Sequence, residues 1–299
     1  MRIIIAGGTG MIGRPLVKEL ADCGHQILVI TRKTNRVHST DQITYIPWLF
    51  LKSEKIGNEF SNVDAVINLA GENLGSQLWS QKRKNALISS RVEASNKLVD
   101  AIKNHRISPK VFIQASAIGY YGKNIDLSIT EDDKPGADFL SEICLRWETT
   151  SQPVENLGIR RLIIRTGVVL SPDEGAFKRL LLPIRLFVGG PLGTGAQQIS
   201  WIHLKDELAA IQFLLENENC QGIFNLTAPN PLSNKEIGKM LAGHINRPYW
   251  LPTPGFLLRL VLGEMSDVVL DSQKVLPKRL LEAGFSFKYP DFGKALESF

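Results

Sequence analysis

The chain has 299 residues, of which 43% are hydrophobic and 22% are charged, and this composition is typical of a folded globular protein. It excludes a disordered or fibrous chain, and no run of about 18 apolar residues predicts a membrane-spanning helix. The net charge of +5 comes from 35 basic and 30 acidic residues with no dense basic stripe, so we do not expect nucleic-acid binding.

The first 31 residues predict a strand, a glycine turn, a helix and a second strand. Apolar runs at residues 2–6 and 26–31 flank a helical pattern over residues 15–23. The same alternation continues along the chain, with strands expected at 63–70, 111–115 and 161–165 and helices at 80–104 and 138–157. The pattern predicts an α/β fold with a Rossmann-type, doubly wound parallel sheet.

The second half of the chain is less regular and predicts a smaller substrate lobe. Residues 189–195 are rich in Gly and predict a loop. Ser233 and Glu236 have the spacing of a capping box, so a helix is expected to begin there. Further helices are expected around residues 256–262 and 272–283. We expect a dinucleotide-binding domain over residues 1–248, with substrate-lobe segments from about residue 170, and a small helical domain over residues 249–299.

The glycine turn is the clearest functional signal. Residues 7–13 read GGTGMIG and lie between the first strand and the first helix. Glycine allows a tight turn and a close approach of a pyrophosphate, and the helix start offers free N–H groups. We assign cofactor contacts to Gly7, Thr9, Gly10, Met11, Ile12 and Gly13.

The end of the second strand indicates which dinucleotide binds. An acidic residue there would hydrogen-bond the ribose of NAD, but this chain has Thr31, Arg32 and Lys33. A guanidinium at Arg32 suits the 2′-phosphate of NADP, so NADP (NADPH) is favoured over NAD. The alternative is a solvated basic turn.

Two further segments are candidates for cofactor contact. Leu69, Ala70 and Gly71 end the third long apolar run, where a small-residue turn can lie beside the cofactor. Arg91 lies on the next predicted helix, where it could reach the pyrophosphate. The alternative for Arg91 is an ordinary surface ion pair with a carboxylate.

With these motifs, the chain resembles the extended form of the short-chain dehydrogenase/reductase superfamily. Matching segments occur in the family's order at residues 7–13, 68–71, 115–117, 120–122, 165–170 and 201–206. Within this superfamily the chain is similar to an epimerase-like subgroup that has a small C-terminal domain. The similarity lies in residues 71–73, 189–193, 252–256 and 284–287. Members of the subgroup are labelled epimerases or cell-division inhibitor homologues. The resemblance implies a cofactor contact at Val169, a small-molecule substrate of sugar-nucleotide type, and a homodimer.

The superfamily's mechanism uses a Ser or Thr, a Tyr, and a Lys four residues after the Tyr that lowers its pKa. Ser116 matches the first of these, but Leu140 and Cys144 stand where the Tyr and the Lys would be. The usual proton relay is therefore absent. Tyr120 and Tyr121 follow Ser116 closely, and either one could donate a proton or simply form a wall of the nicotinamide pocket.

Other polar residues have structural interpretations. We favour a structural role for His203 and for Asp206, which reads as a cap or a first-turn charge of a helix. Trp201, Gln198 and the 189–195 loop would lie over the substrate cavity by resemblance, and Trp201 could equally belong to the core. Cys23, Cys144 and Cys220 have neither disulfide-framework nor metal-ligand spacing, so we expect buried thiols and no metal site.

Two hypotheses of function follow. The first is an NADP-dependent oxidoreductase or epimerase of unidentified substrate. We expect it in the cytoplasm, because the sequence starts with the strand-like residues 2–6 and shows no basic n-region or cleavage site. The second is a non-catalytic NADP(H)-binding protein that regulates or interacts with a partner, because the Tyr and Lys are missing. Neither hypothesis involves a nucleic acid or a membrane.

Overall fold

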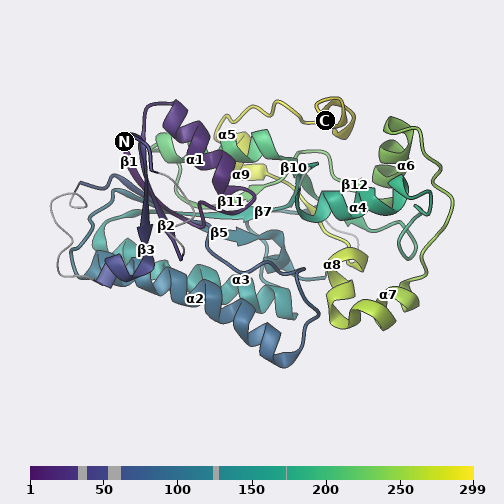
Figure 1. The fold of residues 1–299 in the computed structure, drawn as a ribbon, viewed down its shortest axis with the longest axis horizontal. Coiled ribbons are helices and arrows are strands. Elements are labelled where there is room, and N and C mark those ends of the chain that lie inside the picture. Colours follow the sequence, from purple (N-terminus) through teal and green to yellow (C-terminus); the bar gives the residue numbers. More distant parts are fainter. Residues whose placement is uncertain (33–38, 53–61, 124–127, 173) are drawn as a thin grey trace.

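The computed structural model describes residues 1–32, 39–52, 62–123, 128–172 and 174–299 (Figure 1). Within these residues, seven strands form one sheet in the order β11-β7-β5-β4-β1-β2-β3, and all neighbouring strands are parallel. The strands are β1 (Arg2–Ala6), β2 (Gln26–Thr31), β3 (Ile43–Pro47), β4 (Ala65–Asn68), β5 (Val111–Ala117), β7 (Arg160–Thr166) and β11 (Gly222–Leu226). The predicted doubly wound sheet is confirmed.

Helices cover both faces of this sheet. Figure 1 shows α1 (Gly13–Asp22) and α5 (Leu204–Glu216) on one face, and α2 (Gln81–Lys103) and α3 (Phe139–Thr150) on the other. Successive side chains of β1 point to opposite faces, so Ile3 packs with Leu16 of α1 while Ile4 packs with Leu98 of α2. Because both faces are buried, the strands read as continuous apolar runs.

A smaller lobe lies at the end of the molecule away from β3 (Figure 1). Its strands pair as β8 (Val168–Leu170) with β10 (Trp201–His203), β9 (Gln198–Ile199) with β12 (Leu232–Ser233), and β6 (Ser128–Ile129) with β13 (Lys274–Val275). Its helices are α4 (Gly175–Arg185), α6 (Asn234–His244), α7 (Gly255–Leu262), α8 (Asp267–Leu270) and α10 (Phe292–Leu296), whereas α9 (Lys278–Glu282) packs on β11, with Leu280 in the core of the main sheet. Phe177, Trp201, Leu241 and Phe292 share one buried core there.

Several elements differ from the sequence-based expectations. β3, β11 and α4 were not expected. The helix expected over 138–157 ends at Thr150 and is followed by the 3₁₀ helix η4 (Gln152–Leu157), because Pro153 has no N–H to continue an α-helix. The stretch 272–283 is helical only in α9, since Lys274–Val275 form β13 and Pro277 precedes the helix. The remaining short helices are η2 (Trp48–Lys52), η3 (Ile118–Tyr121) and η5 (Gly263–Ser266).

The helix α7 is unusual because none of its eight residues is buried, although seven of them are apolar or Gly. Phe256, Leu257, Leu260 and Val261 are exposed, and their spacing puts them on one face of the helix. Among the helices that the structure describes, none has the length and hydropathy needed to cross a membrane.

Candidate functional site

A cavity of about 540 Å³ opens where β2, β1 and β4 end. Parallel strands present their carboxyl ends at one edge of the sheet, which is where α/β folds bind ligands. Eight of the residues assigned from sequence line this cavity: Gly7, Thr9, Gly10, Thr31, Arg32, Leu69, Ala70 and Gly71. The other five do not line it: Met11, Ile12, Gly13, Arg91 and Val169.

The glycine turn has the geometry that a diphosphate needs. Gly7 has a φ of 83°, and a Cβ on it would lie 2.7 Å from the carbonyl of Leu69. A Cβ on Gly13 would collide with the carbonyl oxygen of Gly7. The following helix α1 has no side-chain cap and no acidic residue in its first turn, so its first N–H groups are open to an anion. The residues present therefore fit a dinucleotide phosphate.

The end of β2 forms one wall of the cavity. Thr31 is buried there and Arg32 is exposed, whereas Lys33 lies outside the described residues. Trp48 and Lys97 complete this wall, and the Lys97 ammonium lies 5.5 Å from the centre of the Trp48 ring. Sequence reasoning missed both, because η2 and α2 meet β2 only in the folded chain. It also missed the other lining residues, which are Ile30, Glu72, Ala86, Ser89, Ser90, Glu93 and Ala94.

Arg91 lies behind the opposite wall and not at the surface. Its exposed fraction is 8%, and its Nη1 and Nη2 donate to the carbonyl oxygens of Leu87 (2.9 Å) and Glu72 (3.0 Å). Its guanidinium lies 5.0 Å from the ring centre of Trp147. No carboxylate of the described residues forms an ion pair with it, so the alternative of a surface ion pair is wrong.

The start of α4 contacts the glycine turn and the loop that follows β4. Arg14, in the first turn of α1, pairs with Glu174 at 3.0 Å, and a Cβ on Gly175 would lie 2.7 Å from the sulfur of Met11. One turn into α4, Arg179 donates to the carbonyl oxygen of Gly75 at 2.7 Å. Met11 therefore packs against α4, while Ile12 packs on the sheet core and Val169 is buried in β8.

The Ser116 hydroxyl belongs to a buried polar network at the end of β5. Its hydroxyl donates to Oε1 of Glu148 at 2.6 Å, and Glu148 also accepts two hydrogen bonds from Arg165, each 2.9 Å long. Burial alone would lower the pKa of Arg165, but the bonds and charge of Glu148 raise it above its ordinary value. The Ser116 oxygen keeps its lone pairs, so it can still accept a hydrogen bond.

The two tyrosines differ in what their hydroxyls do. The Tyr121 hydroxyl is buried, donates to Asn225 (2.7 Å) and accepts from Arg165 (2.9 Å), and burial raises its pKa to about 12. Tyr120 is only partly buried, and its ring centre lies 3.3 Å from the guanidinium carbon of Arg165. No hydrogen bond joins its hydroxyl to any described residue. Of the two, only Tyr120 has a hydroxyl without a hydrogen-bond partner among the described residues, and neither tyrosine lines the dinucleotide cavity.

Leu140 and Cys144 occupy the face of α3 that packs on η3. A Cβ on Gly119 would lie 3.2 Å from Leu140 and 3.8 Å from the Cys144 sulfur. Burial raises the pKa of the Cys144 thiol to about 11, so it is neutral at physiological pH. Neither side chain can supply a proton relay or a fixed cation from this face.

The remaining candidates have structural positions. The His203 ring caps α5 by accepting from the N–H of Lys205, and burial followed by nearby lysines lowers its pKa to about 4. Asp206 accepts the N–H groups of Lys288 and Tyr289. Trp201 is completely buried in the core. Of the three cysteines, Cys144 and Cys220 are buried as expected, but Cys23 is exposed, which corrects the expectation for that thiol.

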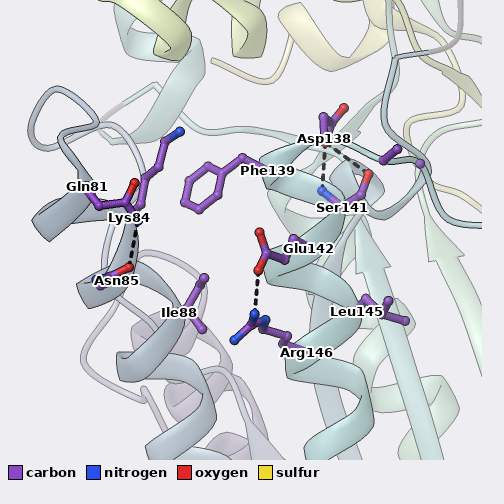
Figure 2. Close-up of a pocket in the computed structure, with 12 residues that line it drawn as sticks. Gln81, Lys84, Asn85, Ile88, Asp138, Phe139, Ser141, Glu142, Leu145 and Arg146 are labelled. Atoms are coloured by element: carbon purple, nitrogen blue, oxygen red, sulfur yellow. Dashed lines mark hydrogen bonds and ion pairs between the residues drawn. The ribbon is translucent and has the colours of Figure 1, made fainter.

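A second cavity of about 600 Å³ lies between α2 and α3, apart from the glycine turn. Figure 2 shows its polar side chains pairing locally: Asp138 accepts from Ser141, and Glu142 pairs with Arg146. Its lining has no glycine turn and no open helix start, so it lacks the features that suit a dinucleotide.

The fold and the glycine turn together define a Rossmann-type dinucleotide-binding protein. The chain matches the NAD dependent epimerase/dehydratase family over residues 3–227, and a domain of unknown function over residues 253–299. It therefore belongs to the NAD(P)-binding epimerase family within the short-chain dehydrogenase/reductases.

Individual relatives agree with this assignment. An epimerase family protein of Staphylococcus aureus (strain MRSA252) is 41% identical over 295 residues, which is 98% of this chain and 97% of the relative. The crystal structure of human epimerase family protein SDR39U1 with NADPH is 30% identical, with a TM-score of 0.90 over 100% of this chain and 98% of that one. A nucleoside-diphosphate sugar epimerase from Corynebacterium glutamicum is 28% identical, with a TM-score of 0.78 over 99% of this chain and 57% of that one.

Proposed function

We propose that the protein binds NADP(H) in the cavity at the ends of β2, β1 and β4, and is an oxidoreductase or epimerase of a sugar-nucleotide-like substrate. The observation that carries the proposal is the exposed guanidinium of Arg32 on the wall of a cavity that begins at an uncapped glycine turn. The human relative crystallised with NADPH and the sugar epimerase relative add support. Three free cysteines fit a cytoplasmic setting.

The residues divide the cofactor between them. Gly7, Gly10 and Gly13 would let the backbone approach the diphosphate, and Arg32 would hold the adenosine 2′-phosphate. Bound nicotinamide would accept or donate a hydride. Thr9, Thr31, Leu69, Ala70 and Gly71 line the groove, with Met11, Ile12 and Val169 supporting it from the packed layer behind.

For the protein's own acid–base chemistry, we assign the proton-donating role to Tyr120. Its hydroxyl is not committed to another side chain, whereas that of Tyr121 is held between Arg165 and Asn225. A phenol can donate a hydrogen bond or a proton to an oxygen that becomes negatively charged in the reaction. Ser116, fixed by Glu148, can orient a substrate hydroxyl by accepting its hydrogen bond.

The test of cofactor binding is calorimetric titration of the wild type with NADPH and NADH. We expect tighter NADPH binding, and in Arg32→Ala a loss of about 1–3 kcal/mol for NADPH only, since only NADPH has the 2′-phosphate. Arg146→Ala, which changes an exposed arginine on α3, is the matched control. Equal affinities for both cofactors in the wild type would refute the NADP preference.

A second candidate function is a non-catalytic NADP(H)-binding regulatory or interaction protein. Leu140 and Cys144 favour it, because they leave α3 without a proton relay. Deuterated NADPH distinguishes the two functions. An enzyme transfers the deuterium to a carbonyl or sugar-nucleotide substrate, whereas a non-catalytic protein does not. A regulator must instead bind its partner differently with NADP⁺ and with NADPH.

A further inference from the structure

The helix α7 presents an apolar face that none of the described residues covers. Phe256, Leu257, Leu260 and Val261 are all exposed, and Leu260 reaches 79%. The helix α6, in the same lobe, instead exposes two lysines, a glutamate and a histidine. Surface helices normally turn a polar face of that kind to water. The face of α7 is therefore not an ordinary solvent-facing helix side.

The opposite side of α7 and the segment after it attach the helix to the protein. Leu258 and Leu262 are half-buried. At about 100° per residue, they lie across the helix from the exposed face. Glu264, which follows α7, forms an ion pair with Lys84 of α2. Figure 1 shows α7 at the edge of the smaller lobe, so its four exposed apolar side chains point away from the rest of the chain.

The size of this face suits a contact between two proteins. The exposed fractions of its four side chains correspond to on the order of 500 Å² of apolar surface, and patches of this size often have a function. Covering the face with a similar one would remove about 1,000 Å² from water, which is the lower end of the range for specific protein interfaces. The area therefore predicts a complex that forms and separates with protein concentration.

The pattern on α7 is complementary to itself. Phe256 and Leu260 form one row along the helix, and Leu257 and Val261 form the next. Arg259 is the only charged residue of α7, and it lies about 130° from the centre of this stripe. Two copies of α7 that cross in opposite directions would therefore join apolar rows without burying like charges. A two-fold axis through the stripe produces this arrangement, as in an isologous dimer.

The charges beside the face argue against a lipid surface. Residues 255–271 contain one basic residue, Arg259, and three acidic residues, Glu264, Asp267 and Asp271. Helices that lie on a membrane surface typically carry Lys and Arg on their polar side. A second protein surface therefore suits α7 better than an anionic membrane.

We propose that α7 joins two copies of this chain in a two-fold symmetric, reversible dimer. The sequence resemblance to the epimerase-like subgroup implies a homodimer but assigns no surface to it, and the apolar face of α7 supplies one. No residue of α7 lines the dinucleotide cavity, so this inference does not depend on the proposed function.

Sedimentation velocity of the full chain, from micromolar to several hundred micromolar, tests the dimer. The wild type should shift from monomer to dimer over this range. Leu260→Glu should weaken dimerisation by about a hundredfold or more, because two carboxylates would meet in an apolar contact. Leu281→Glu, at an exposed leucine of α9, is the matched control and should change the dissociation constant by less than about twofold.

The groove between α2 and α3 in Figure 2, which Leu145 lines, is an alternative contact surface. If Leu145→Glu separates the dimer and Leu260→Glu does not, the contact is that groove and the inference is overturned. A wild type that stays monomeric at the highest concentration overturns it as well. Sedimentation of that monomer with phosphatidylserine–phosphatidylcholine vesicles would assign α7 to a lipid surface instead.

A cysteine variant checks the contact without adding charge. In a Cys23→Ser background, which removes the exposed native thiol, Leu260→Cys should give a covalent dimer on oxidation with copper phenanthroline, whereas Leu281→Cys should not. No covalent dimer from Leu260→Cys, at a concentration where the wild type is dimeric, overturns the inference. Thermal unfolding shows whether Leu260→Glu is folded, and the cysteine variant keeps the test available if it is not.

Discussion

Buried carboxylates of this protein have different partners and therefore different charges. Glu148 is held by Arg165 and by the Ser116 hydroxyl. Glu207 is completely buried and accepts one hydrogen bond, from Thr166, while its Oε2 has no partner among the described residues. Burial raises the pKa of Glu207 to about 8, so this carboxyl group is protonated at neutral pH.

Replacing Glu207 by Gln should change how stability depends on pH. The folded-state pKa lies above the unfolded value, so wild-type Glu207 binds more protons when folded, and its contribution to stability is lost as pH rises from about 5 to about 8. Gln does not ionise, so Glu207→Gln should gain on the order of 5 kcal/mol relative to wild type as pH rises from 5 to 9, at about 1.36 kcal/mol per pKa unit. Urea unfolding at several pH values measures this.

His203 has the opposite pH dependence, since its lowered pKa makes stability fall as pH drops below about 6.5. Both proteins contain His203, so the difference between them isolates Glu207. Glu216→Gln, at a half-exposed position on the same helix, is the control. Parallel stability profiles for wild type and Glu207→Gln would contradict the assignment.

Among the elements, α6 begins as its sequence predicts. The Ser233 hydroxyl accepts from the N–H of Glu236 (3.2 Å), and the Glu236 carboxylate accepts from the N–H of Ser233 (2.8 Å). The Ser233 hydroxyl also donates to the Glu236 carboxylate (2.6 Å), and this bond, followed by the one from the Ser233 N–H, lowers the pKa of Glu236. Both N–H groups would otherwise be unsatisfied at the helix start.

Loss of this cap should be measurable by itself. We expect Ser233→Ala to lower the free energy of unfolding by about 0.5–2 kcal/mol, because one N–H loses its acceptor. Ser233→Thr keeps a hydroxyl and should retain most of the stability. The urea midpoint at constant m-value reports the change. A Ser233→Ala midpoint equal to that of wild type would show that the cap contributes nothing.

Elements with strong local patterns could be predicted, and those defined by tertiary pairing could not. The apolar runs of β1 and β2 match the structure residue by residue, because a doubly covered strand is apolar throughout. β3 is an edge strand with only Ile46 buried, so its pattern is weak. Likewise the glycine turn is local in sequence, whereas Trp48 and Lys97 reach the cavity from separate elements. The Ser116 network joins residues up to 104 positions apart, which no spacing rule detects.

At the scale of the whole molecule, residues 288–298 pack against residues 201–206. Asp206 binds the backbone of Lys288 and Tyr289, and the His203 ring contacts the Ser298 hydroxyl at 3.0 Å. Phe292 packs edge-on against Trp201, with ring centres 5.2 Å apart. We propose that residues 249–299 form a small domain that folds only together with residues 1–248.

Phe292→Ala tests this coupling. Phe292 is 2% exposed, so removing its ring should lower the free energy of unfolding by about 3–5 kcal/mol. Unfolding should remain a single transition when followed by tryptophan fluorescence and by circular dichroism. Leu260→Ala, at a position 79% exposed, should change stability by less than about 0.5 kcal/mol. Two separate transitions would instead mean that the C-terminal segment folds independently.

The exposed face of α7 has a consequence for how this part of the chain can evolve. Phe256, Leu257, Leu260 and Val261 support no core, so polar replacements there carry little folding cost. Neutral drift would therefore convert them to polar residues over time, as it does at most solvent-facing helix positions. Apolar side chains retained at these four positions in distant relatives would record selection for something other than a stable fold.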